Sequence, residues 1–147
     1  MPDRPELWTC PHCARTFANR NQTHSCAALG DLGRHFRGKA PAIRALFELF
    51  VERLRACGPF EVLPQKSRIA FHRRMSFAQL TPKQGWIDGH LVLAEPMPHP
   101  MVRRIVRYSP RNHVHEFRLA GPADLDDPGF LALLAAAYVV GEQKHLD

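Results

Sequence analysis

The sequence predicts an α+β fold, with a mostly antiparallel sheet of about five to six strands flanked by an N-terminal and a C-terminal helix. Three observations lead to this prediction. Short segments in the middle of the chain alternate polar and apolar residues, which is the period of a strand. One helical stripe precedes these segments and another follows them. The composition also shifts near residue 36, so we expect a small module over 1–36 and an α+β domain over 37–147.

The first helix is predicted over 41–57. Pro41 suits the first helical turn, and Gly58 with Pro59 forms a stop signal. The apolar residues recur at the spacing of one buried helix face; they are Ile43, Leu46, Phe47, Phe50, Val51, Leu54 and Cys57.

Period-two segments follow this helix, separated by turns rich in proline and glycine. Short connections between consecutive strands favour an antiparallel, meander-like sheet. The strand candidates are 60–64, 67–72, 74–80, 86–94, 101–108 and 113–120.

A second helix is predicted over about 126–140, at the end of the chain. Asp126 or Asp127 can cap its N-terminus, and Gly141 provides the stop at its C-terminus. The acidic residues near its start also complement the helix dipole, which gives them a structural reason to be there.

The composition indicates a soluble globular protein, with 45% apolar and 23% charged residues. No apolar run approaches the ~18 residues of a membrane span, so no membrane partner is expected. The N-terminus lacks the apolar core of a signal peptide, which predicts a cytoplasmic protein. In that reducing compartment, closely spaced cysteines bind metal more often than they form disulfides.

The chain is basic, with a net charge of +6, and the charge is concentrated in its middle. Residues 41–120 hold 13 Lys/Arg against 6 Asp/Glu. Such a region suggests an anionic partner such as nucleic acid or another anionic ligand. An arginine-rich surface that serves solubility explains the same numbers, so both interpretations stand.

The stretch WTCPHCARTFANRNQTHSC, over 8–26, has the spacing of a zinc site. A Cys-x2-Cys turn supplies two thiolates, and after ten intervening residues a histidine and a cysteine supply the other two donors. The predicted ligands are Cys10, Cys13, His24 and Cys26. His35 could replace His24 or Cys26, and a chance cluster without metal is the remaining alternative.

Four protein donors close the zinc site, so the predicted Zn²⁺ is structural rather than catalytic. Cys10, Cys13 and Phe17 fit the first half of a DNA-reading zinc finger. Cys26 stands where the first histidine of such a finger would be, and no suitable partner follows it. This departure weakens the case for groove readout by the module.

A second group of candidates lies on the predicted strands, where basic side chains and histidines alternate. If the faces of two strands coincide, these residues form a cationic pocket for a phosphate or carboxylate. If they do not, the residues belong to a polar sheet face covered by water. The candidates are Lys66, Arg68, His72, Arg111, His113 and His115.

No catalytic residue is predicted. Ser67, Ser76 and Ser109 lack the Gly-x-Ser-x-Gly setting of a nucleophile, and no phosphate-binding glycine loop occurs. The sequence favours a non-enzymatic binding module with a basic surface for nucleic acid. The alternatives are a small anionic-ligand protein or enzyme using Lys66, Arg68, His113 and His115, and a structural protein-interaction module.

The order of motifs resembles an uncharacterised bacterial family, the domain of unknown function 5655, in a version with an N-terminal zinc-binding segment. The resemblance is carried by the zinc stretch and by HFRGKAPAIRALFELF, GPFEVLPQKSRIAFHRRMSFAQL, PRNHVHEFRL, DLDD and AYVVG. It implies a zinc-binding head on a small α+β domain with no established activity. It also implies Cys10, Cys13, His24 and Cys26 as the metal ligands.

Overall fold

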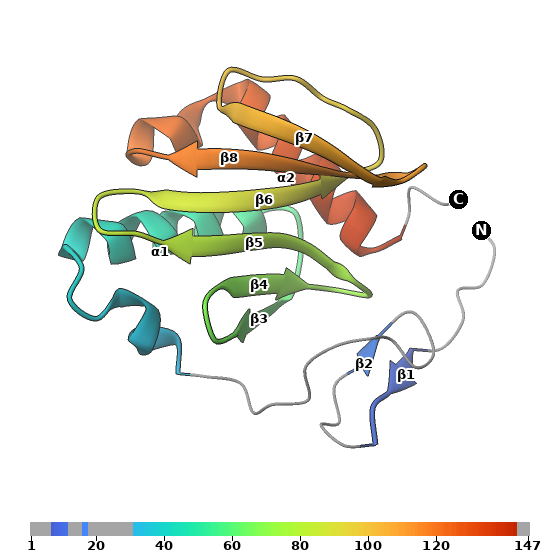
Figure 1. The fold of residues 1–147 in the computed structure, drawn as a ribbon, viewed down its shortest axis with the longest axis horizontal. Coiled ribbons are helices and arrows are strands. Elements are labelled where there is room, and N and C mark those ends of the chain that lie inside the picture. The colour runs from blue at the N-terminus through green and yellow to red at the C-terminus, as the bar shows by residue number, and fades with distance from the viewer. Residues whose placement is uncertain (1–6, 12–15, 18–30, 144–147) are drawn as a thin grey trace.

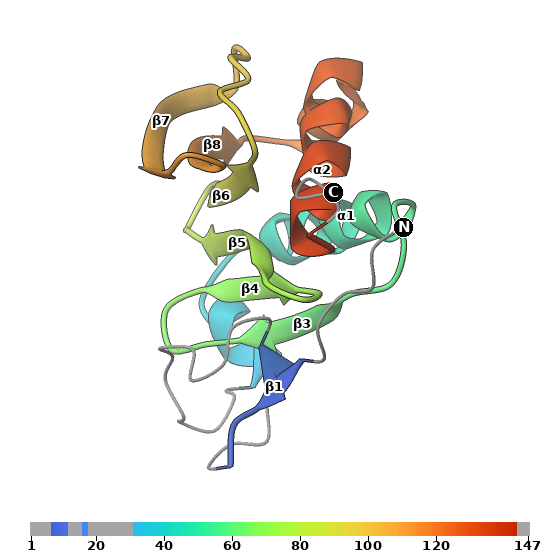
Figure 2. The ribbon, with the colours of Figure 1, turned by 90° about the vertical axis from the view of Figure 1, so that its right-hand side faces the viewer.

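The computed structural model describes residues 7–11, 16–17 and 31–143, and it has the predicted α+β architecture. Two helices lie on one face of a six-stranded antiparallel sheet (Figure 1, Figure 2). The strands of this sheet are β3 (Glu61–Pro64), β4 (Ile69–His72), β5 (Ser76–Pro82), β6 (Ile87–Leu93), β7 (Val102–Ser109) and β8 (Asn112–Leu119). The helices are α1 (Pro41–Arg55) and α2 (Pro128–Gly141). A separate pair of strands, β1 (Trp8–Thr9) and β2 (Thr16–Phe17), precedes them, and short 3₁₀ helices cover Leu32–Phe36 and Pro122–Asp126.

The strand order is β3-β4-β5-β6-β8-β7, and it departs from a simple meander at the last two strands. The chain runs as a meander from β3 to β6. The connection over 94–101 then carries it past one strand position to the edge of the sheet, and β8 returns between β6 and β7. This connection is long enough to span two strand spacings, about 10 Å, whereas a tight turn is not.

The helix boundaries follow the local signals that the sequence contains. Pro41 occupies the first turn of α1, and the buried face of α1 is the predicted apolar stripe. At α2, Asp127 is the cap, because its carboxylate accepts a hydrogen bond of 2.9 Å from the Phe130 N–H. Helix α2 therefore begins at a side-chain cap, whereas α1 begins at a proline with no side-chain cap.

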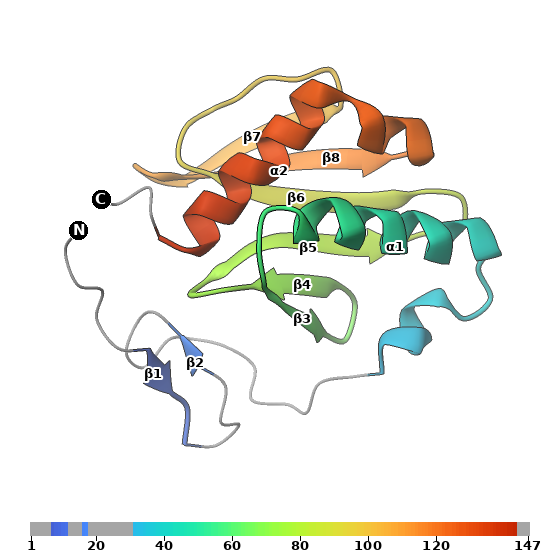
Figure 3. The same cartoon turned by 180° about the vertical axis from the view of Figure 1, so that it is seen from behind.

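The core lies between the helices and the sheet (Figure 3). Aromatic rings join the layers, since Phe50 of α1 lies 5.4 Å from Phe71 of β4 and 6.3 Å from Phe117 of β8, measured between ring centroids. Phe130 of α2 packs edge-on against Phe117. A side chain at Gly89 of β6 would collide with the Phe117 ring, so this glycine makes room for the core.

The strand register assigns each residue to one of two faces. Phe71, Ala78, Leu91 and His115 are successive cross-strand partners, and Phe71 touches α1, so this row lies on the helix-covered face. The next row points the other way and forms the open face of the sheet. It consists of Gln79, His90, Glu116 and Arg104.

Candidate functional site

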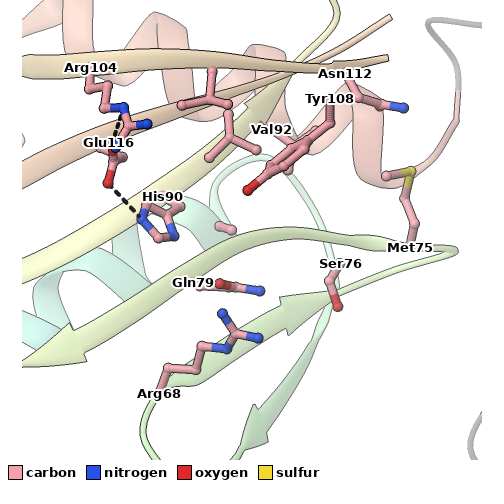
Figure 4. A pocket seen from close by; sticks show the side chains of 13 residues that line it. Arg68, Met75, Ser76, Gln79, His90, Val92, Arg104, Tyr108, Asn112 and Glu116 are labelled. Atoms are coloured by element: carbon pink, nitrogen blue, oxygen red, sulfur yellow. Dashed lines mark ion pairs between the residues drawn. The ribbon is translucent and has the colours of Figure 1, made fainter. Parts of the chain in front are cut away.

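The open face of the sheet is hollowed into a pocket of about 440 Å³ (Figure 4). Its floor is apolar and its rim is polar, which is the usual construction of a ligand site. The floor is formed by Val92, Val106 and Val114, and the polar rim by Arg68, Ser76, Gln79, His90, Arg104, Asn112 and Glu116, with Met75 and Tyr108 at one end. Strands β5 to β8 all contribute, and Arg68 and Met75 lie in the turns on either side of β4, so the pocket depends on the pairing of several strands.

A row of polar side chains crosses this pocket. The His90 Nε2 atom lies 3.5 Å from Glu116 Oε1, and the Arg104 Nε atom lies 3.5 Å from Glu116 Oε2. Glu116 is the direct cross-strand partner of both residues, so the register of three strands holds the group together. Arg68, the residue before β4, faces this group from the opposite side of the pocket in Figure 4.

Tyr108 and Asn112 close one end of the pocket. The Tyr108 side chain is 74% exposed, which is unusual for an aromatic residue. The Asn112 amide donates a hydrogen bond of 2.7 Å to the Ser109 hydroxyl, while its Oδ1 atom is buried and has no partner among the described residues. This end therefore offers an aromatic surface and an unused acceptor.

A second row of charged residues lies beside the pocket on the same face. Arg118 donates a hydrogen bond of 2.9 Å to Asp88, and its guanidinium lies 4.6 Å from the centre of the Trp86 ring. Partial burial raises the pKa of Asp88, but hydrogen bonds from Arg118 and Trp86 and the nearby charges of Arg118 and Lys83 together outweigh it, so the pKa lies below its ordinary value. Lys83 and Arg103 line a smaller hollow beside these residues, which extends the basic character of the face.

Another hollow, of about 640 Å³, lies beside α1, between that helix and the 84–85 and 120–122 turns. Its lining is mainly alanine, leucine and glycine, and its two charged residues are Glu48 and Glu52. The described residues that line this hollow include no Lys or Arg, so it offers no cation to an anionic partner. The basic open face is therefore the better candidate for the partner that the net charge suggests.

The predicted basic residues lie at separate places. Arg68 is in the pocket. Lys66 is exposed in the turn before β4, where its carbonyl accepts a hydrogen bond from Arg34, and Arg111 is exposed at the tip of the β7–β8 hairpin. His72 faces the open side but is buried.

His72 connects the sheet to the N-terminal strands. Its Nε2 atom lies 3.1 Å from the Thr16 carbonyl, and its Nδ1 atom lies 3.2 Å from the Ser76 hydroxyl. A carbonyl can only accept, so Nε2–H donates to Thr16 and Nδ1 accepts from Ser76. Both nitrogens are occupied, and the role of His72 here is structural.

His113 and His115 lie on the helix-covered face, away from Lys66 and Arg68. The Met97 N–H donates to His115 Nε2 at 2.9 Å, and His115 Nδ1–H donates to the His113 carbonyl. Burial is the main reason that the pKa of His115 lies below its ordinary value, and the adjacent His113 lowers it further. The structure therefore does not bring the six predicted residues into one pocket.

The sequence contains a signal for this separation. His113 and His115 share the parity of Phe117 and Leu119, which are core residues, whereas Arg68 has the parity opposite to Ile69 and Phe71. The sequence prediction missed the row of His90, Glu116 and Arg104, because it depends on β8 pairing with both β6 and β7.

Of the predicted zinc ligands, Cys10 is described and is 2% exposed, directly after β1. Cys13, His24 and Cys26 lie outside the described residues. Strands β1 and β2 pair with each other, and in the sequence the Cys-x2-Cys motif lies between them. Among the residues that the structure describes, no group of three His, Cys, Asp or Glu side chains could hold a metal.

His35, the alternative ligand, is buried in the 3₁₀ helix that precedes α1. Its Nε2 atom has no hydrogen-bond partner in the described part of the chain. Burial lowers the pKa of His35, against the effect of a hydrogen bond with the Gln65 backbone, and the nearby Arg34 and Lys39 lower it further. The neutral imidazole that a metal requires is thus the favoured form.

Within the described ranges, no helix combines the length and the apolar character that crossing a bilayer requires. No curated protein and no solved structure matches the chain. The family described as Domain of unknown function (DUF5655) matches residues 33–141, a range that contains both helices and all strands of the large sheet. The chain therefore belongs to the DUF5655 family.

Proposed function

We propose that the open face of the sheet binds single-stranded nucleic acid. The observation that carries this proposal is the pocket itself, where Arg68 and Arg104 stand on opposite sides of an apolar floor beside the exposed Tyr108 ring. Guanidinium groups bind phosphates, and aromatic rings on an open surface stack with unpaired bases.

The shape of the face favours a single strand over a duplex. A pocket of about 440 Å³ can take one base only if that base leaves its stack, which single-stranded substrates permit at low cost. Arg118, Lys83 and Arg103 continue the basic surface beyond the pocket and can contact neighbouring phosphates.

Fluorescence polarisation with labelled single-stranded and duplex oligonucleotides tests this proposal. At ~50 mM salt we expect binding to the single strands, with an affinity that falls as salt rises. Arg104→Ala and Arg68→Ala should each weaken binding and reduce the salt slope by about one. Arg44→Ala, which removes the same charge from α1 on the far side of the molecule, is the matched control. Absence of binding to any single strand at this salt would refute the proposal.

A small anionic ligand is the second candidate, and the pocket volume favours it. Cavities of about 300–1,000 Å³ are typical of small-molecule sites. Calorimetric titration with nucleoside monophosphates distinguishes the two. If a mononucleotide binds saturably and as tightly as an oligonucleotide, the small ligand is favoured. If the oligonucleotide binds more tightly, contacts outside the pocket contribute to its binding, as a strand requires.

We further propose that the N-terminal segment binds one structural Zn²⁺ through Cys10, Cys13, His24 and Cys26. The burial of Cys10 and the pairing of β1 with β2 support this proposal. When bound, zinc would order the segment, which is too short to bury a core of its own. A cytoplasmic location belongs to the same proposal, because a reducing compartment keeps thiols available for metal.

Metal analysis of the purified chain tests the zinc proposal. We expect about one zinc per chain, lost on Cys10→Ser or Cys26→Ser. Cys57→Ser is the control, because Cys57 follows α1 and lies outside the segment. Loss of zinc on His35→Ala with retention on His24→Ala would instead assign His35 as the ligand.

A further inference from the structure

His90 differs from the other histidines of the sheet in what it contacts. His72 and His115 each use both ring nitrogens in hydrogen bonds that involve at least one backbone group. Among the described residues, the partner of the His90 ring is the Glu116 carboxylate, 3.5 Å away. The side chains of His90 and Glu116 are 42% and 36% exposed, so both can reach a bound molecule.

A histidine oriented by a carboxylate is the usual arrangement of a general base. Here the pair lies inside a pocket that also holds two arginines. The Arg104 Nε atom contacts Glu116, and the Arg104 side chain is 69% exposed, which leaves its remaining N–H groups available for a phosphate. Arg68 approaches from the opposite side of the pocket.

We propose that this pocket cleaves single-stranded RNA by transphosphorylation; this inference rests on the proposed binding of single strands. His90, beside Glu116, accepts the proton of a ribose 2′-hydroxyl on Nδ1, the ring nitrogen that does not face the carboxylate. The 2′-oxygen then forms a bond to the adjacent phosphorus, and the bond from phosphorus to the 5′-oxygen breaks. The departing 5′-oxygen takes a proton from water, and the imidazolium returns its proton to solvent.

The products are a 2′,3′-cyclic phosphate and a 5′-hydroxyl, and no oxidant, reductant or second substrate is consumed. Arg68 and Arg104 stabilise the charge that develops on the phosphate oxygens. DNA lacks the nucleophile, so the pocket binds it without cutting it. Tyr108 stacks with a base next to the cleaved bond and positions it.

The test uses a labelled DNA oligonucleotide that contains a single ribonucleotide, incubated with the full chain. Cleavage is expected only on the 3′ side of the ribonucleotide, with a cyclic phosphate identified by mass spectrometry. His90→Asn and Glu116→Gln should each slow it by about 100-fold or more while binding of the all-DNA strand is kept. Glu95→Gln, purified in parallel, is the control, since Glu95 is exposed on the connection after β6.

The outcomes separate the two proposals. An oligonucleotide that is bound but not cut overturns the catalytic inference and leaves the binding function intact. Equal cleavage by the parent chain and His90→Asn assigns the activity to a contaminant and overturns the inference as well. Failure to bind any single strand overturns both. Circular dichroism of the variants confirms that they fold, and two independent substitutions guard against a local structural effect.

Discussion

The two faces of the large sheet use the same residue type in opposite ways. On the helix-covered face, His115 is fully buried and held by two backbone groups. On the open face, His90 is partly exposed and paired with a carboxylate inside a pocket. Glu116, which pairs with His90, is the immediate neighbour of His115 on β8. Strand alternation therefore decides whether a polar side chain serves the fold or remains available to a ligand.

The two faces should differ most in how much free energy of unfolding is lost when an aromatic side chain is truncated to alanine. Phe71→Ala removes a fully buried ring that contacts Phe47, Phe50 and Phe60, and it should lower the free energy of unfolding by about 3–5 kcal/mol. Tyr108→Ala on the open side should change it by less than about 0.5 kcal/mol. Urea denaturation measures both values. If Tyr108→Ala lowered the free energy of unfolding as much as Phe71→Ala, the open face would have to be covered in solution.

A matched pair of histidine substitutions is the next largest contrast. His115→Leu leaves the Met97 N–H without its acceptor, which should cost about 1–3 kcal/mol at pH 7.5. His90→Leu removes a half-exposed pair and should cost less than about 1 kcal/mol. Both are measured by urea denaturation, and a larger cost for His90 would contradict the assignment of the faces.

The pH dependence sharpens this contrast. The pKa of His115 is lowered by burial in the folded state, so the unfolded chain takes up its proton first as the pH falls below the ordinary imidazole value of about 6.5. Stability from His115 is thus complete above that pH and declines below it until the folded-state pKa is reached. Between pH 7.5 and 5.5, urea denaturation should therefore show that His115→Leu flattens the decline in the free energy of unfolding. The pKa of His35 is also lowered by burial, so His35 contributes to the decline in stability that remains in the His115→Leu variant.

The elements were predictable because each depends on residues close in the sequence. The stripe of α1, the Asp127 cap and the alternation of the strands are local, and the observed boundaries fall close to the predicted ones. The order of β7 and β8 was not predictable, since it depends on where the 94–101 connection crosses the sheet. The row of His90, Glu116 and Arg104 requires that order and the register, so it became visible only in the structure.

The zinc ligands could be predicted without knowledge of the strand order, because the prediction depends only on their spacing in the sequence. Cys10 and Cys13 define a turn that needs no knowledge of the sheet. What the sequence could not supply is the attachment of this segment to the domain. That attachment runs through His72, which the sequence grouped with the basic residues and which the structure places against Thr16.

A smaller effect is therefore expected at His72. His72→Ala removes hydrogen bonds to Thr16 and Ser76 and should weaken the attachment of β1 and β2 by roughly 1 kcal/mol. Hydrogen exchange of the β1 and β2 amides should accelerate about five-fold, while that of β6 is unchanged. Ser109→Ala, which removes a hydroxyl at the other hairpin, is the control. Unchanged exchange in β1 and β2 would show that other contacts hold these strands.

A small effect on stability is also expected at Glu116, which positions His90 in the proposed cleavage. Glu116→Gln replaces a carboxylate whose two ion pairs, to His90 and Arg104, are both 3.5 Å long and solvent-accessible. Such pairs contribute about 0–1 kcal/mol, and the amide keeps the shape of the side chain. The free energy of unfolding should change by less than about 0.5 kcal/mol. Since the fold does not need this charge, a large loss of RNA cleavage in the same variant would separate function from stability. A loss of several kcal/mol would instead make the charged row a structural device, and the open face would then resemble the covered one.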